Sequence, residues 1–374
     1  MKLVYVIFCL LIFSPSLAHS ALANPDGLCI NNTNCADSNN SNSSAVTPRA
    51  VNANNFHPGF YFASNYDSIT YFDAYKDKEY FVGIKKLYKW RDLEIAEGVY
   101  DFSGIQADLA HAESIHKQLW IAISVTEYNG RVRPKTPPYM WNDPKYGCGP
   151  EFYGAYKRSV QNDGWLPCSW NEHVHERLVA LYQALGALLN NEPHFEGINI
   201  DETSTGKPLD TSLGWSSVKE LAAFKATALA VKNAFPDKTV LQMINYASFD
   251  VIEFANWLVN NGIGTSGPDV HLGEENKEFL NKVIYPFHFA NHNHVPTGIE
   301  VQHDNYTRYG QTPEIILGGT IERINPWYMF WHNREANLSK GEDPARFFTH
   351  GVIPLLNEYG QHLPAAEKFY RSMQ

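Results

Sequence analysis

The sequence of 374 residues predicts an α/β protein, a (β/α)8 TIM barrel in a single domain with long βα loops. From Phe60 onward, short runs rich in β-forming residues alternate with amphipathic helical segments. Eight such units fill the chain from residue 60, which suits a barrel enlarged by loop insertions. The rival fold, an open doubly wound sheet, would carry a Gly-x-Gly-x-x-Gly phosphate loop after its first strand, and that motif is missing.

Each expected strand is a short apolar or aromatic run bounded by turn-forming residues. The eight strands are expected at residues 59–62, 83–88, 119–125, 197–200, 240–244, 268–272, 298–301 and 327–331. The longest helices are expected at residues 172–189 and 218–234. No internal repeat is visible, so the eight units are related by topology and not by sequence.

The composition limits the class of protein. Hydrophobic residues make up 44% and charged residues 19%, which excludes a disordered, collagen-like or coiled-coil chain. The net charge is -10, whereas proteins that bind nucleic acid or anionic membranes usually carry basic patches. No such partner is therefore expected. The aromatic share of 14% must either fill a core or form flat surfaces for flat ligands such as sugar rings.

The amino-terminal region has the pattern of an export signal followed by a leader. A basic start, the apolar run 3–13 and the small residues 21–23 predict a signal peptide over residues 1–23. Residues 24–55 are rich in Asn and Ser and are expected to be a disordered leader. The barrel domain is then expected over residues 56–374, in a secreted or periplasmic protein.

The cysteines agree with an oxidising compartment. Four remain after the signal peptide, namely Cys29, Cys35, Cys148 and Cys168, and they allow three disulfide connectivities. The pairs close in sequence, Cys29 with Cys35 and Cys148 with Cys168, are favoured. The close C-x-x-C spacing of structural zinc sites is absent.

Acidic residues stand where two of the expected strands end. Asp201 and Glu202 follow the fourth strand, and Glu300 lies near the end of the seventh. The carboxyl ends of barrel strands meet at one face, so these side chains should converge. Hydrolysis of a glycosidic bond needs one carboxylic acid to protonate the leaving oxygen and one carboxylate to attack or to activate water. The pair Glu202 and Glu300 can supply both.

This arrangement resembles the clan of retaining β-glycosidases on (β/α)8 barrels, glycoside hydrolase clan A, without indicating an individual family. Residues 90–94 (W-R-D-L-E) and 98–102 (G-V-Y-D-F) resemble a segment after strand two in several branches of that clan, including β-galactosidases and xylanases. The resemblance implies Glu202 as acid/base and Glu300 as nucleophile. It also implies Trp331 or Trp327, on the eighth strand, as the platform under the sugar.

Further roles follow from the same resemblance. Asn245 and Tyr246 become substrate contacts, as does Asp201, which stands where most of these families carry Asn. Its charge is expected to alter sugar preference or to raise the pKa of Glu202 by like-charge repulsion. Arg91 follows strand two and is expected to orient the nucleophile carboxylate and keep it ionised.

The sequence thus predicts a secreted glycoside hydrolase, endo-acting on a β-linked polysaccharide or oligosaccharide by a retaining mechanism, without a metal or organic cofactor. One alternative is a carbohydrate-binding barrel without activity, and another is similar chemistry with inversion or substrate assistance. A third is a metal-dependent polysaccharide hydrolase or deacetylase. The histidines that suggest a metal are His288, His292 and His294, and separately His173 and His175.

Overall fold

The computed structural model describes residues 56–149, 151–157, 164–272, 277–302, 311–333, 348–360 and 362–367. All of them belong to one compact unit, Val46–Gln374. The expected signal peptide, the expected leader and the cysteines Cys29 and Cys35 lie outside the described residues. Among the described helices, none is both long and apolar enough to cross a bilayer.

Eight parallel strands close into a barrel, in which each strand pairs with its two neighbours and the last pairs with the first. The order around the barrel is β1 (Gly59–Asn65), β2 (Phe81–Lys89), β5 (Gln118–Ser124), β8 (Phe195–Ile200), β9 (Thr239–Met243), β10 (Gly264–Gly267), β11 (Thr297–Val301) and β12 (Tyr328–His332). The predicted (β/α)8 fold is therefore confirmed. We call the carboxyl-terminal end of these strands the mouth of the barrel.

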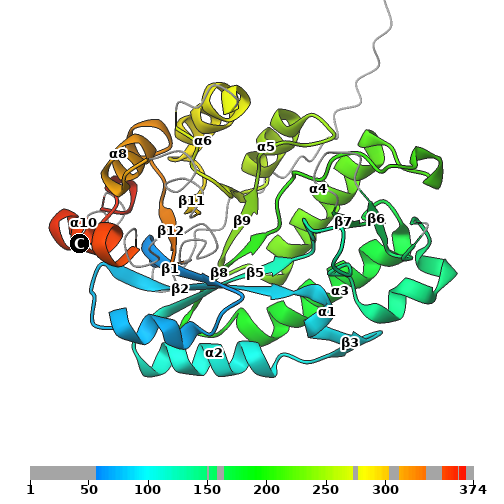
Figure 1. Cartoon of the computed structure of the whole chain (residues 1–374), viewed down its shortest axis with the longest axis horizontal. Helices are drawn as coiled ribbons and strands as arrows, with labels where there is room; N and C mark the ends of the chain where they lie inside the picture. Colours follow the sequence, from blue (N-terminus) through cyan, green and yellow to red (C-terminus); the bar gives the residue numbers. More distant parts are fainter. Residues whose placement is uncertain are drawn as a thin grey trace, which may run out of the picture. The chain divides into compact units, whose positions relative to one another are not determined.

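Helices follow the strands and surround the barrel (Figure 1). The α-helices are α1 (Trp90–Leu93), α2 (Ser103–Ser114), α3 (Glu172–Leu189), α4 (Ser217–Ala234), α5 (Val251–Asn260), α6 (Tyr285–Asn291), α8 (Pro313–Arg323) and α10 (Ile353–Tyr359). Short 3-10 helices lie at η2 (Ile69–Tyr75), η3 (Pro138–Asn142), η4 (Pro144–Tyr146) and η5 (Thr211–Leu213), and π-helical turns at η7 (Leu280–Ile284) and η9 (Phe348–Val352). The predicted helices at 172–189 and 218–234 correspond to α3 and α4.

Seven of the eight predicted strands overlap an observed strand, and the sixth was wrong. It was expected at 268–272, whereas β10 occupies Gly264–Gly267, directly before that segment. A Cβ on Gly264 would lie 2.4 Å from Leu241 Cδ2, and one on Gly267 would lie 2.6 Å from Ile299 Cδ1. Neighbouring residues leave no room for a side chain at either glycine, so β10 lacks the apolar pattern by which strands are recognised.

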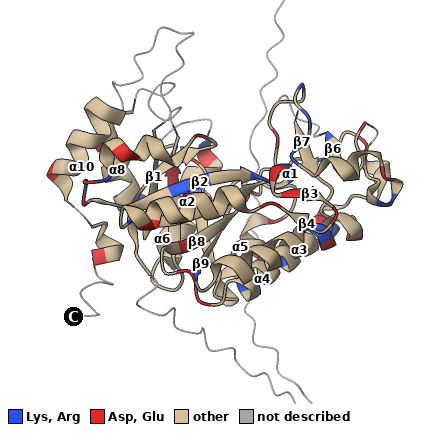
Figure 2. Ribbon diagram, turned by 90° about the horizontal axis from the view of Figure 1, so that it is seen from below, with Lys and Arg blue, Asp and Glu red and all other residues tan. Residues whose placement is uncertain are grey.

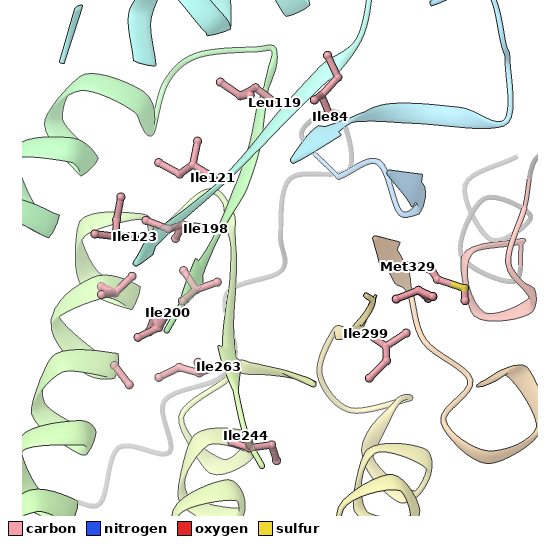
Figure 3. Packing of buried hydrophobic residues seen from close by; sticks show 14 of the residues in the cluster. Ile84, Leu119, Ile121, Ile123, Ile198, Ile200, Ile244, Ile263, Ile299 and Met329 are labelled. Carbon is pink, nitrogen blue, oxygen red and sulfur yellow. The ribbon is translucent and has the colours of Figure 1, made fainter. Parts of the chain in front are cut away.

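The two faces of the strands form two layers of core. Outward-facing residues such as Ile121, Ile123 and Ile198 pack between the strands and the surrounding helices (Figure 3). Inward-facing Tyr61, Trp120, Leu241, Tyr328 and Phe330 form a second cluster that fills the barrel itself. The alternation follows from the two-residue period of a strand.

The end of the barrel opposite the mouth is closed by aromatic and ionic contacts. Phe56 packs on Trp327 and Tyr328, with ring centroids 5.3 and 5.8 Å apart. The buried carboxylate of Glu196 accepts hydrogen bonds from the Tyr328 hydroxyl at 2.6 Å and from the His57 backbone N–H at 2.7 Å. The open end of the barrel is thus the mouth, where the predicted acids lie.

Between β5 and α3 the chain makes a long excursion that holds η3, η4 and the hairpin of β6 (Ala155–Lys157) and β7 (Trp165–Pro167). A disulfide joins Cys148 to Cys168 across this excursion, with their Cα atoms 6.1 Å apart. One of the two favoured cysteine pairs is therefore confirmed.

Removing this disulfide is expected to lower stability by about 3 kcal/mol, because the bond restricts a loop of moderate length in the unfolded chain. The double substitution Cys148→Ala, Cys168→Ala should lower the melting temperature in a thermal scan. Reductant should shift wild type to the same value and leave the variant unchanged. An unaltered melting temperature in the variant would contradict a stabilising role.

Candidate active site

Glu300 lies inside the barrel on β11, and its carboxylate is 3% exposed. Its Oε1 contacts the ammonium of Lys85 on β2, and its Oε2 lies 2.8 Å from His332 Nε2 on β12. The Asn199 amide, on β8, approaches Oε1 at 3.4 Å. Three strands therefore direct polar side chains at one buried carboxylate, and the two basic partners favour its ionised form.

Lys85 is fully buried on the inner face of β2. Its ammonium lies 4.7 Å from the ring centroid of Phe330, in addition to its contact with Glu300. Burial lowers the pKa of Lys85 well below its usual range, and the negative charge of Asp201 opposes that shift. Lys85 is one of three lysines on β2, with Lys86 and Lys89, and the sequence alone did not show which of them points into the barrel.

Glu202 lies at the mouth, in the loop that follows β8. The hydroxyl of Tyr128 donates to its Oε1, and the amide of Asn245 donates to Oε2 at 2.5 Å. Burial, together with the nearby charges of Asp201 and Asp269, raises the pKa of Glu202 to about 7, although the two hydrogen bonds act in the opposite direction. Glu202 therefore keeps its proton to a higher pH than an ordinary glutamate does.

Asp201 is held by the protein itself. Its Oδ2 accepts the backbone N–H groups of Val125 and Thr126 at 2.8 and 2.9 Å, and its Oδ1 accepts the N–H of Glu202 at 3.0 Å. These bonds fasten the start of the β8 loop to the end of β5. The expected repulsion on Glu202 is present, whereas the carboxylate oxygens are engaged with backbone groups and not turned to a ligand.

Asn199 connects Glu300 to the strand that precedes Glu202. It lies on β8, three residues before Glu202, and its amide nitrogen reaches Glu300. Its amide oxygen accepts from Trp120 Nε1 at 2.9 Å, which fixes the orientation of the amide. Glu202 and Glu300 thus lie at the carboxyl-terminal ends of β8 and β11, in opposite electrostatic environments.

Comparison with known proteins bears on the fold. No family model matches this chain, and no curated protein matches it. Among solved structures, the catalytic domain of a β-amylase from Paenibacillus polymyxa has a TM-score of 0.53 at 9% identity, covering 74% of this chain and 92% of that one. A β-galactosidase from Bacillus circulans has a TM-score of 0.51 at 12% identity, covering 73% and 50%.

A second β-galactosidase, from the psychrophilic Marinomonas ef1, has a TM-score of 0.52 at 8% identity, covering 74% of this chain and 54% of that one. The chain therefore spans about half the length of the β-galactosidases it matches. At these identities the likeness concerns the barrel. The expected resemblance to (β/α)8 glycosidases is thereby confirmed at the level of the fold.

Arg91 was predicted to orient Glu300, but its guanidinium instead donates to the backbone oxygens of Arg133 and Pro134, both at 3.0 Å. Arg91 lies on α1, beyond the end of β2, where it secures the loop after β5. The cation that contacts Glu300 is Lys85, deeper on the same unit. The prediction that Arg91 orients Glu300 is therefore wrong, and the cation that contacts Glu300 lies within β2 and not after it.

Neither predicted platform tryptophan reaches the mouth. Trp331 is fully buried and belongs to the outer core with Ile299 and Val301, because its position on β12 points away from the barrel axis. Trp327 precedes β12 at the closed end, where its Nε1 donates to the His292 carbonyl at 2.6 Å. Assigning Trp331 or Trp327 as the platform is therefore wrong for this arrangement.

Three tyrosines take the exposed aromatic positions around the mouth. Tyr66 follows β1, Tyr128 follows β5 and Tyr246 follows β9, with exposed fractions of 40%, 41% and 37%. Of the predicted substrate contacts, Asn245 therefore lies against Glu202 and Tyr246 beside it at the same end. The loop tryptophans Trp165 and Trp170 pack within their loops, against Phe152 and Tyr156.

The segment after β2 that carries the resemblance has a structural role. Glu94 is fully buried and accepts from Trp90 Nε1 at 2.8 Å, from Arg177 Nε at 2.9 Å and from the Gly98 N–H at 3.0 Å. The hydroxyl of Tyr139 donates to the same carboxylate at 2.9 Å. Residues 90–100 are thereby fixed to α3 and to the excursion after β5.

The histidines considered as metal ligands are separated in the structure. His288 is buried and its Nδ1 lies 2.9 Å from the Thr265 hydroxyl, whereas His292 contacts the Phe289 carbonyl at 2.5 Å. His173 lies 3.4 Å from Glu176 and His175 lies 3.4 Å from Thr227. In the part of the chain that the structure describes, no three His, Cys, Asp or Glu side chains gather as a metal site.

Proposed function

We propose that the protein is a glycoside hydrolase that cleaves β-glycosidic bonds with retention, with Glu300 as nucleophile and Glu202 as acid/base. The observation that carries the proposal is the contrast between the two carboxylates. Glu300 contacts two basic side chains, Lys85 and His332, whereas burial and neighbouring carboxylates raise the pKa of Glu202 to about 7. Two titratable groups with opposed environments at one site are the pattern of an ionised nucleophile and a protonated acid.

In the first step the ionised Glu300 attacks the anomeric carbon, and Glu202 gives its proton to the departing glycosidic oxygen. The bond to the leaving sugar breaks as the glycosyl ester on Glu300 forms. In the second step Glu202, now a carboxylate, takes a proton from water, whose oxygen attacks the same carbon and releases Glu300. Asn245 and Tyr128 hold Glu202 in position for both transfers.

An extended substrate and internal cleavage belong to the same proposal. The exposed rings of Tyr66, Tyr128 and Tyr246 follow three different strands, so sugar rings on both sides of the cleaved bond could stack on them. The disulfide between Cys148 and Cys168 supports a secreted enzyme.

The direct test is a panel of β-glucans, mannans, xylans, galactans and chitosan, with reducing ends measured for wild type and for the double variant Glu202→Gln, Glu300→Gln. Release by wild type alone supports the proposal. NMR of the first product gives the anomer, and inversion would overturn the double-displacement mechanism. Binding without release across the panel would favour a carbohydrate-binding barrel.

The pH dependence tests the role of Glu202 separately. A general acid works in its protonated form, so kcat/KM should fall as the pH rises through about 7. The Tyr128 hydroxyl stabilises the charged form of Glu202, so Tyr128→Phe should raise that pKa and move the alkaline limb to higher pH. Tyr71→Phe, at an exposed tyrosine of η2, is the control. If the alkaline limb of the kcat/KM profile stays in place in Tyr128→Phe, the limb reports the titration of a group other than Glu202.

A further inference from the structure

Basic side chains gather on one side of the mouth, at the end of β2 and in the loop that follows β5. They are Lys89, Arg131, Arg133 and Lys135. In the described part of the chain, no carboxylate oxygen lies within 4.0 Å of their charged groups. A protein with a net charge of -10 thus presents cations without anionic partners beside its candidate active site.

Lys135 is the best defined of these cations, because it is 6% exposed and fixed by neutral oxygens. Its ammonium donates to the Tyr66 hydroxyl and to Ser124 Oγ, both at 2.8 Å, and also to the Thr126 carbonyl. The Tyr66 hydroxyl in turn donates to Ser124 Oγ at 2.9 Å. These three bonds use all the N–H groups of the ammonium, so Lys135 acts on a neighbouring anion through its charge and not through a further hydrogen bond.

Tyr66 joins the two lysines into one surface. The ammonium groups of Lys89 and Lys135 lie 5.0 and 5.3 Å from the centroid of its ring. The ring is 40% exposed and the Lys89 ammonium lies over it, so a sugar that reaches this tyrosine meets an aromatic edge together with positive charge.

This surface adjoins the two glutamates. Lys89 and Lys85 are four residues apart on β2 and so share its inner face, which places Lys89 at the mouth above the contact between Lys85 and Glu300. Lys89 also pairs in register with Ser124. Thr126, which accepts from Lys135, donates its N–H to Asp201 beside Glu202.

Among the described residues, cations without carboxylate partners thus lie at the end of β2 and in the loop after β5, a loop that also carries Glu127. The acids Asp201, Glu202 and Asp269 follow β8 and β10. Figure 2 shows basic residues on the ribbon of β2, in a molecule whose charges of both signs are otherwise dispersed. A substrate with negative charge on one side would be oriented by this field as well as attracted by it.

We propose that Lys89, Lys135 and Tyr66 form a subsite for an anionic sugar, one that carries a carboxylate or a sulfate ester, next to the bond that is cleaved. The inference rests on the proposed glycosidase function and names its substrate class as an acidic β-linked glycan. The negative charge of the whole chain does not oppose this, because salt confines the influence of a charge to about 10 Å.

The test compares a β-1,4-linked oligoglucuronate with the same oligosaccharide after reduction of its carboxyl groups to alcohols. A sulfated β-galactan before and after desulfation forms the second arm, and it separates sulfate from carboxylate recognition. Wild type should cleave one anionic substrate with a KM about tenfold or more below that of its neutral counterpart. That advantage should shrink as NaCl is raised from about 20 to about 200 mM, because salt screens charge.

Lys89→Met should raise KM for the anionic substrate about tenfold and change it within about twofold for the neutral one. Lys89→Arg should restore most of the loss. Lys135→Met should act in the same direction, although it also removes three internal hydrogen bonds. Lys232→Gln, which removes one positive charge in the last turn of α4, at the opposite end of the barrel, is the control.

Calorimetric binding to the double variant Glu202→Gln, Glu300→Gln separates this inference from the proposed function. Hydrolysis of neutral glycans only, or an unchanged KM in Lys89→Met, would overturn the anionic subsite and leave the hydrolase. Absence of hydrolysis with anion binding that Lys89→Met abolishes would overturn the hydrolase and keep the subsite. No binding of either anionic oligosaccharide would overturn the subsite outright.

Discussion

Replacing Glu300 by glutamine should lower kcat by about 10³-fold or more, since the neutral amide cannot form the glycosyl ester on which the proposed mechanism depends. The substitution keeps the size of the side chain, so substrate binding should be largely retained. Glu322→Gln, at an exposed glutamate near the end of α8, should leave kcat unchanged. Turnover in Glu300→Gln close to that of wild type would remove this residue from the mechanism.

Azide distinguishes the roles of the two glutamates. In Glu300→Ala the small anion can enter the space of the lost carboxylate and attack the anomeric carbon of an activated aryl β-glycoside, which gives the α-glycosyl azide. In Glu202→Ala the glycosyl ester on Glu300 still forms, and azide then displaces it to give the β-glycosyl azide. Equal anomers from the two variants would contradict the assignment of nucleophile and acid/base.

Lys85→Met should destabilise the fold by about 3–5 kcal/mol, because it leaves the buried carboxylate of Glu300 without its ammonium partner. Urea denaturation followed by tryptophan fluorescence measures the change. The double substitution Lys85→Met, Glu300→Leu should recover most of the loss, because both charges are then gone from the interior. Lys86→Met, on the outer face of the same strand, is the matched comparison and should cost less, since its partner Asp108 is partly exposed.

A Lys85→Met variant as stable as wild type would show that the contact between Lys85 and Glu300 is not a stabilising ion pair. That outcome would remove one of the two contacts that favour the ionised form of Glu300, the form that attack requires. The stability measurement therefore bears on mechanism without needing a substrate.

The fold could be predicted because most elements carry their own local signal. The strand at β5 is a continuous apolar run, and α3 has apolar residues at helical spacing with a capping Asn171 whose side chain accepts from the Val174 N–H at 3.2 Å. The prediction of the sixth strand failed at β10, whose sequence is Gly-Thr-Ser-Gly. The glycines are required there by side chains that come from other parts of the chain. No local pattern contains that information.

Some residues of the candidate site could likewise be predicted from the sequence, and others could not. Glu202 and Glu300 could be found from their place at strand ends, which is a topological rule. The partners Lys85 and His332 depend on which face of β2 and β12 points inward and on side chains brought together across the barrel. Trp331 was misassigned for that reason, because a shift of one residue along a strand moves a side chain from the interior to the outer core.

The aromatic filling of the barrel has a consequence for turnover. The interior of the barrel beyond Glu300 is filled by Tyr61, Trp120, Tyr328 and Phe330. The proposed site is therefore closed on that side. Among the described residues, the filled interior closes the approach from the opposite end, so water reaches the glycosyl ester from the mouth, where the first product also departs. Water and the hydroxyl group of a second sugar therefore compete for the same glycosyl ester. A high concentration of sugar should favour transglycosylation, in which a new glycosidic bond forms, over hydrolysis.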